Sequence, residues 1–222
     1  MPAQRLVKDQ AVNVSRFDVV GEDSEKTEFF IKHVGMAKEG GEIRTAGEAI
    51  PVAHMKPPLQ QEGSIHAHVL GSANLSADEI QQIKVALDDV EGEYEAYQLR
   101  RNWLKQYVIC PHVKPVYGKD GTVIYRRYSC AGLVIETYRE ADIDLVADEE
   151  LPVVDEDILR QGYGDILQRL DNKKREYCGI DGNGPWPVLL PGYVIQSLNK
   201  SAEEIRARPY QSVRGDELFC RT

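Results

Sequence analysis

The chain lacks a surplus of basic residues. Its 222 residues include 27 Lys and Arg against 36 Asp and Glu, which gives a formal net charge of −9. Binding to nucleic-acid phosphates or to an anionic membrane surface depends on such a surplus, so we expect neither partner. No apolar run approaches the length of a membrane span, and the first residues have no apolar segment of the kind found in signal peptides. We therefore expect no stable membrane anchor and, by default, a cytoplasmic protein, with non-classical secretion left open.

Cysteine is also scarce. The four cysteines are Cys110, Cys130, Cys178 and Cys220, and no two of them form a C-x-x-C pair. A disulfide scaffold would be shorter and denser in cysteine. The wide spacing favours reduced thiols and predicts neither a bound cofactor nor a metal site.

The composition, 42% hydrophobic and 28% charged, is that of a folded chain with a sizeable core. Residue patterns predict an α+β fold. We expect strands at 17–20, 29–37, 42–45 and 63–70, a loop at 55–61, a hairpin from 113–117 and 122–125, and helices at 76–91, from 129, and at 158–170. The turn at 38–41 favours 42–45 as the partner strand of 29–37.

The character of the chain changes after Ala147, where acidic runs and a Gly- and Pro-rich stretch begin. We expect a core over 1–147 and an extension or cap over 148–222 that packs on the same domain. If the acidic residues of 148–157 border a binding cleft, they would disfavour anionic substrates.

Cys130 is the most informative position for chemistry. Ser129 is a suitable N-cap, so the pattern places Cys130 in the first turn of a helix. The helix dipole and the free N–H groups at that end favour a thiolate and can bind an oxyanion. A buried, inert cysteine is the common alternative.

The stretch from Ser129 to Leu145, Ser-Cys-Ala-Gly-Leu-Val-x-x-x-Tyr-Arg-Glu-Ala-x-Ile-Asp-Leu, resembles the nucleophile helix of NlpC-type papain-like cysteine peptidases. Ser129 and Ala131 stand where those proteins usually carry Asp and Ser. Ordinary members have their histidine after the cysteine, whereas all five histidines here precede Cys130. The order therefore resembles the circularly permuted YiiX-like and lecithin–retinol-acyltransferase-like groups.

Three further segments resemble the permuted groups in the right order. They are Phe17-Asp-Val-Val, His33-Val-Gly-Met-Ala followed by two glycines, and the stretch from Leu75-Ser-Ala-Asp-Glu-Ile to Gly92-Glu-Tyr-Glu. The resemblance implies a small antiparallel barrel or sheet packed on the Cys130 helix. It also implies a cysteine peptidase or amidase that forms a thioester, with Cys130 as nucleophile and His33 as general base.

The resemblance leaves the residue that orients the imidazole open. Glu48 is our choice, with Thr45 and His54 as alternatives. Tyr94 and Ser129 are expected beside the substrate. His66 and His68 are rivals of His33; their spacing also suits a metal pair, but no third ligand is evident.

Two other functions stay open at this stage: a catalytically inactive binding module of the same fold, and a lipid acyltransferase. The substrate, hydrolysis versus transfer, and the oligomeric state are not predicted by the sequence.

Overall fold

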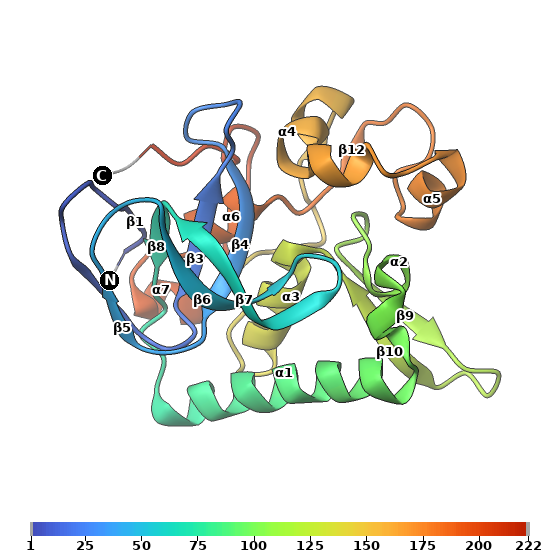
Figure 1. The fold of residues 1–222 in the computed structure, drawn as a ribbon, viewed down its shortest axis with the longest axis horizontal. Coiled ribbons are helices and arrows are strands. Elements are labelled where there is room, and N and C mark those ends of the chain that lie inside the picture. Colours follow the sequence, from blue (N-terminus) through green and yellow to red (C-terminus); the bar gives the residue numbers. More distant parts are fainter. Residues whose placement is uncertain (1, 221–222) are drawn as a thin grey trace.

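A six-stranded antiparallel sheet forms one side of the molecule, and helix α3 packs against it (Figure 1). The computed structural model describes residues 2–220, apart from the side chain of residue 165. In sheet order the strands are β1 (Gln4–Arg5), β8 (Val69–Gly71), β3 (Val19–Asp23), β4 (Ile31–Ala37), β6 (Glu48–Met55) and β7 (Leu59–Ala67). The described strands form no closed barrel, so of the two arrangements expected, barrel or sheet, the structure has the sheet. The α+β class is confirmed.

The remaining strands form three two-stranded ladders: β2 (Val12–Val14) with β5 (Gly41–Ile43), β9 (Val113–Tyr117) with β10 (Val123–Tyr128), and β11 (Val153–Val154) with β12 (Trp186–Pro187). The helices are α1 (Ala77–Ala96), the 3₁₀ turn η1 (Leu99–Arg101), α2 (Trp103–Gln106), α3 (Cys130–Arg139), α4 (Glu156–Leu167), α5 (Asn172–Tyr177), α6 (Pro191–Ser197) and α7 (Ala202–Ala207). Among the described residues, none of these helices has both the length and the apolar character needed to cross a bilayer.

The partner expected for strand β4 is wrong. β4 pairs with β3 and β6, while β5 pairs with β2. β4 is buried along its last four residues, so it needs neighbours that bury apolar surface as well. β5 has a single buried residue, Ile43, whereas β6 is eight residues long and has five.

The expected start of α1 is confirmed. Ser76 and Glu79 form a reciprocal capping box, which satisfies two backbone N–H groups. Gly92 does not end the helix, which continues to Ala96. The reason is Tyr94, which is buried and donates its hydroxyl to the backbone oxygen of Arg126 at 2.9 Å. That contact stabilises the last turn against the cost of a glycine.

Helix α3 begins at Cys130, as the sequence predicts. Ser129 caps it by accepting a hydrogen bond from the N–H of Gly132 at 2.9 Å, and its own N–H donates to the backbone oxygen of His112. A Cβ on Gly132 would lie 2.1 Å from that same oxygen, so only glycine fits there. The small residues after Cys130 thus hold the start of α3 against the segment before β9.

The segment after Ala147 contributes to the same hydrophobic core. Tyr163 of α4, Tyr193 of α6 and Phe219 belong to one cluster of buried side chains with Val34 and Cys130. Helix α6 packs on the sheet, α4 packs beside β4, and α5 lies above α2 in the view of Figure 1. Residues 148–220 therefore extend the hydrophobic core that the sheet and α3 form.

Candidate active site

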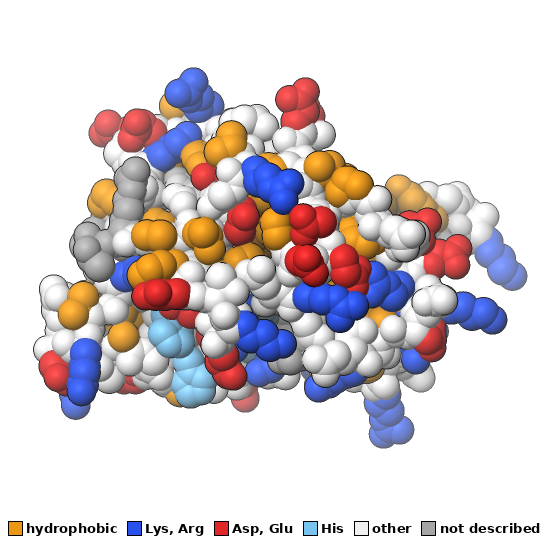
Figure 2. Space-filling view, turned by 90° about the horizontal axis from the view of Figure 1, so that it is seen from above, with side chains coloured by type: hydrophobic (Ala, Val, Ile, Leu, Met, Phe, Trp, Pro, Cys, Tyr) orange, Lys and Arg blue, Asp and Glu red, His pale blue; other side chains and the backbone are white. Residues whose placement is uncertain are grey.

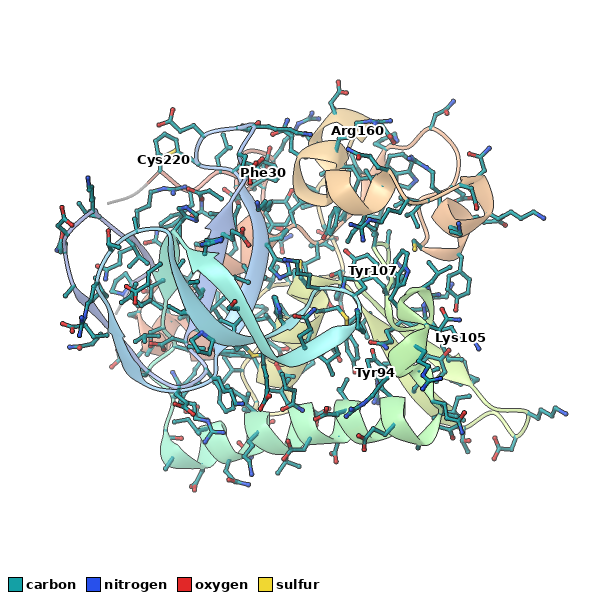
Figure 3. The ribbon with its side chains drawn as sticks, viewed as in Figure 1. Phe30, Tyr94, Lys105, Tyr107, Arg160 and Cys220 are labelled. Carbon is teal, nitrogen blue, oxygen red and sulfur yellow. The ribbon has the colours of Figure 1, made fainter. Side chains whose placement is uncertain are left out.

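Cys130 and His33 line the same pocket, which has a volume of about 160 Å³. Its walls come from strand β4, the turn after β6, helices α2 to α4, and the residues that flank α2 and α4. Figure 3 shows one of the lining side chains, Tyr107, near the middle of the molecule between the sheet and α2. Segments far apart in the sequence thus meet at the start of α3.

The thiol of Cys130 is protonated at neutral pH. Its side chain is buried, and burial raises the pKa to about 11 because the thiolate loses its hydration. Hydrogen bonds from the backbone of Val34 and Ala131 oppose that rise only in part. The bond to Val34 also places the sulfur beside the residue that follows His33. Among the described residues, no hydrogen bond joins the sulfur to the His33 ring directly.

His33 is half-buried on β4 and contacts a second histidine. Its Nε2 lies 2.8 Å from Nδ1 of His54 on β6, with the two ring centroids 4.9 Å apart. Burial lowers the pKa of His33 well below its usual value, and the charges of His54, Lys56 and Lys32 lower it further. The pKa of His54 is lowered to about 4, mainly by burial. Both imidazoles are therefore neutral at pH 7.

A glutamine fixes the direction of the hydrogen bonds. Gln60 donates its amide NH₂ to the backbone oxygen of Lys56, which turns Oε1 toward Nε2 of His54 at 3.3 Å. In the tautomer that fits this contact, Nε2 of His54 carries the proton and its Nδ1 accepts from Nε2 of His33. In this arrangement Nδ1 of His33 has a free lone pair. A base with a free lone pair is what removal of a thiol proton requires.

Two glycines make room for His54. A Cβ on Gly35 would lie 3.0 Å from Cβ of His54, and a Cβ on Gly63 would lie 2.2 Å from its Nε2. Side chains at these positions would displace the ring. The neighbouring strands β4 and β7 therefore supply the space that the second histidine occupies.

The structure does not bring Glu48 to His33. Glu48 opens β6, and its carboxylate accepts a hydrogen bond from the N–H of Arg44 at 2.7 Å. His54 lies six residues further along the strand, about 20 Å at the usual rise of a strand. Thr45, the second alternative, accepts a hydrogen bond from the N–H of Asp9. Of the three residues considered for the orienting position, only His54 contacts His33.

Tyr94 and Ser129 do not line the pocket. Figure 3 shows Tyr94 rising from α1 toward β10, where its hydroxyl bonds to the backbone. Ser129 is buried and acts as the N-cap of α3. Both residues hold the elements around the pocket, and neither faces a substrate in it.

His66 and His68 also lie away from the pocket. Nδ1 of His66 lies 3.0 Å from the backbone oxygen of Gly47, and Nδ1 of His68 lies 3.0 Å from that of His66. His66 is exposed and His68 is half-buried. Neither ring lies with Cys130, so His33 is the histidine that shares its pocket.

Sequence reasoning missed several residues of the pocket. Gln60, which contacts His54 and does not line the pocket, was predicted as part of a loop. The aromatic side chains of Trp103, Tyr107 and Tyr163 line the pocket and carried no motif. Only the position of Tyr107, just before a buried Val-Ile pair, gave a signal of burial. These residues reach the pocket through tertiary packing, which no local pattern encodes.

One cluster outside the pocket has the composition of a metal site. Ligand atoms of His112, Glu136 and Asp148 lie within 4.8 Å of one another. Arg139 already forms ion pairs with both carboxylates, and Nε2 of His112 lies 3.1 Å from Asp148. The hydrogen bond from His112 and the charge of Arg139 lower the pKa of Asp148. A metal would have to displace Arg139, so this cluster is described best as an ion-pair network that ties α3 to the segment after it.

The acidic residues of 148–157 do not line the pocket either. Asp155 caps α4 and pairs with Arg214, and Glu156 pairs with Arg160 and Arg175. The acidic segment was expected to disfavour anionic substrates only if it bordered the binding cleft, and it does not border this pocket.

Comparisons of the chain with models of protein families, with curated proteins and with solved structures found no match.

Proposed function

We propose that the protein is a cysteine hydrolase that cleaves an amide bond through a thioester. The observation that carries the proposal is that Cys130, at the start of a helix, shares one pocket with His33, whose ring is hydrogen-bonded to His54. A nucleophile, a base and a group that orients the base are the three parts that acyl transfer by a thiol needs.

The first step follows from the hydrogen-bond directions. Nδ1 of His33 accepts the proton of the Cys130 thiol as the sulfur attacks the carbonyl carbon of the substrate. His33 is then protonated, and its Nε2–H still donates to His54, so the ring keeps its orientation. Since the pKa values keep both partners neutral at rest, the proton moves during the attack and not before it.

The remaining steps return the enzyme to its starting state. Backbone N–H groups at the start of α3 stabilise the negative oxygen of the tetrahedral intermediate. The carbon–nitrogen bond breaks, and His33 gives its proton to the leaving amine. Water, deprotonated by His33, then attacks the thioester; the carbon–sulfur bond breaks and the carboxylic acid leaves, while the proton returns to the sulfur.

The order of the elements supports the permuted papain-like fold as part of this proposal. His33 lies on β4, His54 on β6, and Cys130 on a later helix packed on the same sheet. This is the order that the resemblance implies.

A catalytically inactive binding module of this fold would be favoured if no residue oriented the ring of His33. Because His54 contacts His33 at 2.8 Å, that reason no longer holds. The described residues that line the pocket do not favour the lipid acyltransferase over the hydrolase.

The test is the reaction of the protein with p-nitrophenyl acetate, an activated ester that acylates thiols without a specific substrate. We expect release of p-nitrophenol with turnover, and an acetyl group on the peptide that contains Cys130. Cys130→Ser abolishes this turnover, while Cys178→Ala, which removes another buried thiol, retains it. Full turnover in Cys130→Ser, with circular dichroism showing both variants folded, would overturn the proposal.

A further inference from the structure

The pocket around Cys130 is basic, although the chain as a whole is acidic. Three basic side chains line it, Lys32, Lys56 and Arg169, and the described residues that line it include no Asp or Glu. The formal charge of the whole chain is −9. The charged side chains that line the pocket are therefore opposite in sign to the net charge of the chain.

Two of these cations have no ion-pair partner among the side chains that the structure describes. Lys32 pairs with Glu22 and Glu25 at 3.3 and 3.9 Å. Lys56 and Arg169 form no ion pair with any described residue, and both are exposed at the mouth of the pocket. Elsewhere on the surface many basic side chains lie next to acidic ones (Figure 2).

Lys56 is held close to the reacting groups. It follows β6, and its backbone oxygen accepts the hydrogen bond from Gln60, the residue that also contacts His54. Its charge also contributes to the lowered pKa of both imidazoles. A group bound by Lys56 therefore lies within the electrostatic reach of His33.

A second pocket of about 200 Å³ adjoins the first and extends the basic surface. The two share Lys32, His33 and Lys56, and the second adds Lys26 and Arg160. Arg160 projects from α4 (Figure 3) and pairs with Glu156 at 2.8 Å. Glu22 and Glu25 also line this second pocket, whereas no described acidic side chain lines the pocket that contains Cys130.

We propose that the site takes an anionic substrate, in which a carboxylate or phosphate next to the scissile amide is bound by Lys56 and Arg169. The inference rests on the proposed function, since it defines the substrate of that same site. Unpaired cations at the mouth of a partly enclosed pocket attract an anion more strongly than the same cations on an open surface, because the pocket excludes part of the water. Met55, Pro57 and Trp103 also line the pocket, so the part of the substrate beside the anion contacts apolar side chains.

The experiment compares two alkylating reagents that differ in charge, iodoacetate and iodoacetamide. Alkylation of Cys130 is followed by peptide mass spectrometry, with N-acetylcysteine amide as a neutral reference thiol in the same solution. We expect the ratio of the iodoacetate rate to the iodoacetamide rate to be at least about fivefold higher at Cys130 than at the reference. The ratio falls toward the reference value at high salt, because salt screens exposed cations.

The variant Lys56→Gln/Arg169→Gln lowers this ratio to that of the reference. Lys119→Gln is the matched control, because it removes a positive charge from the exposed turn of the β9–β10 hairpin. A change in the basicity of His33 would alter the rates of both reagents equally, so it does not affect the ratio of the iodoacetate rate to the iodoacetamide rate.

The outcomes separate the two proposals. If Cys130 reacts in a manner that depends on His33 but shows the reference ratio, the anionic substrate is wrong and the hydrolase stands. If Cys130 reacts with neither reagent faster than Cys178, both proposals are wrong. A competition experiment at constant ionic strength identifies the anion. If acetate slows the alkylation of Cys130 by iodoacetate more than chloride does, the site binds a carboxylate; if inorganic phosphate does so, the site binds a phosphate. If neither slows the reaction more than chloride, the result counts against a bound anion.

Discussion

The molecule contains two buried cysteines with the same acidity and different surroundings. Burial raises the pKa of both Cys130 and Cys178 to about 11. Both are almost fully shielded from solvent and both belong to the same hydrophobic core. Neither burial nor acidity therefore distinguishes the proposed nucleophile, Cys130, from the other buried thiol.

The neighbouring groups do distinguish them. Cys130 opens a helix and faces a pocket that contains His33. Cys178 ends helix α5, lines neither of the two pockets described, and has the guanidinium of Arg127 as its charged neighbour. Its backbone oxygen accepts hydrogen bonds from Ile109 and Cys110, so it joins two segments. Under the proposed function, the difference teaches that a thiol with a raised pKa is useful for catalysis only when it shares a pocket with a base that can take its proton.

Removing the base should have the largest effect. His33→Ala leaves Cys130 with a raised pKa and no proton acceptor, which is the situation of Cys178 in the wild type. We expect turnover of p-nitrophenyl acetate to fall by about 10²- to 10⁴-fold, the usual contribution of a general base. Steady-state kinetics measures this, with His66→Ala as the control histidine. Equal turnover in the two variants would show that another group takes the proton.

Removing the orienting histidine should have the next largest effect. His54→Ala frees the ring of His33, and misplacement of a reacting group by about 1 Å costs on the order of 10²-fold. His54→Asn, whose side-chain oxygen can still accept from His33, should recover part of the loss in kcat. Glu48→Gln, at the other end of β6, should change little. A loss in Glu48→Gln as large as in His54→Ala would restore Glu48 to the orienting role.

Acid should leave Cys130 without a proton acceptor, as Cys178 is, because it protonates His33. The active form has a neutral His33, so activity is lost as the pH falls through the imidazole pKa values. Because burial lowers the pKa of His33 below the usual 6.5 and that of His54 to about 4, activity should persist below pH 6.5. Below the controlling pKa it should fall about tenfold per pH unit. A pH–rate profile in which acidification already reduces activity at pH values above 7 would contradict the lowered imidazole pKa values.

Weakening the end of the hydrogen-bond chain should have the smallest effect. Gln60→Leu removes the acceptor for Nε2 of His54, and one hydrogen bond contributes on the order of 1 kcal/mol. We expect about a fivefold lower kcat with little change in KM. Gln61→Leu is the matched control, because its amide bonds to Glu91, away from the imidazoles. An equal loss in the two variants would indicate a general effect on β7.

The local parts of this architecture were accessible from the sequence. The capping box of Ser76 and Glu79 located α1, and Ser129 located the start of α3, because caps depend on residues three positions apart. The motif after Ser129 selected Cys130 from four cysteines, and the strand motif selected His33 from five histidines.

The contact between His54 and His33 was not accessible in the same way. It depends on β6 lying beside β4, which brings His54 to His33 across 21 positions of the chain. The prediction that 42–45 would pair with 29–37 placed Glu48 near His33, and because the strand pairing was wrong, His54 and not Glu48 is the residue that contacts His33. A bulge between Val52 and His54 shifts the register of β6 against β7, and residue alternation does not reveal such a shift.

The most direct test compares the two cysteines within one molecule. The native protein is treated briefly with p-nitrophenyl acetate, and acetylation of Cys130 and of Cys178 is measured by peptide mass spectrometry in the wild type and in His33→Ala. The account predicts that Cys130 is acetylated at least about a hundredfold faster than Cys178 in the wild type, and that His33→Ala removes most of this difference although it leaves the pocket open. A rate at Cys130 that is unchanged in His33→Ala would contradict the account, because access to the pocket alone would then explain its reactivity.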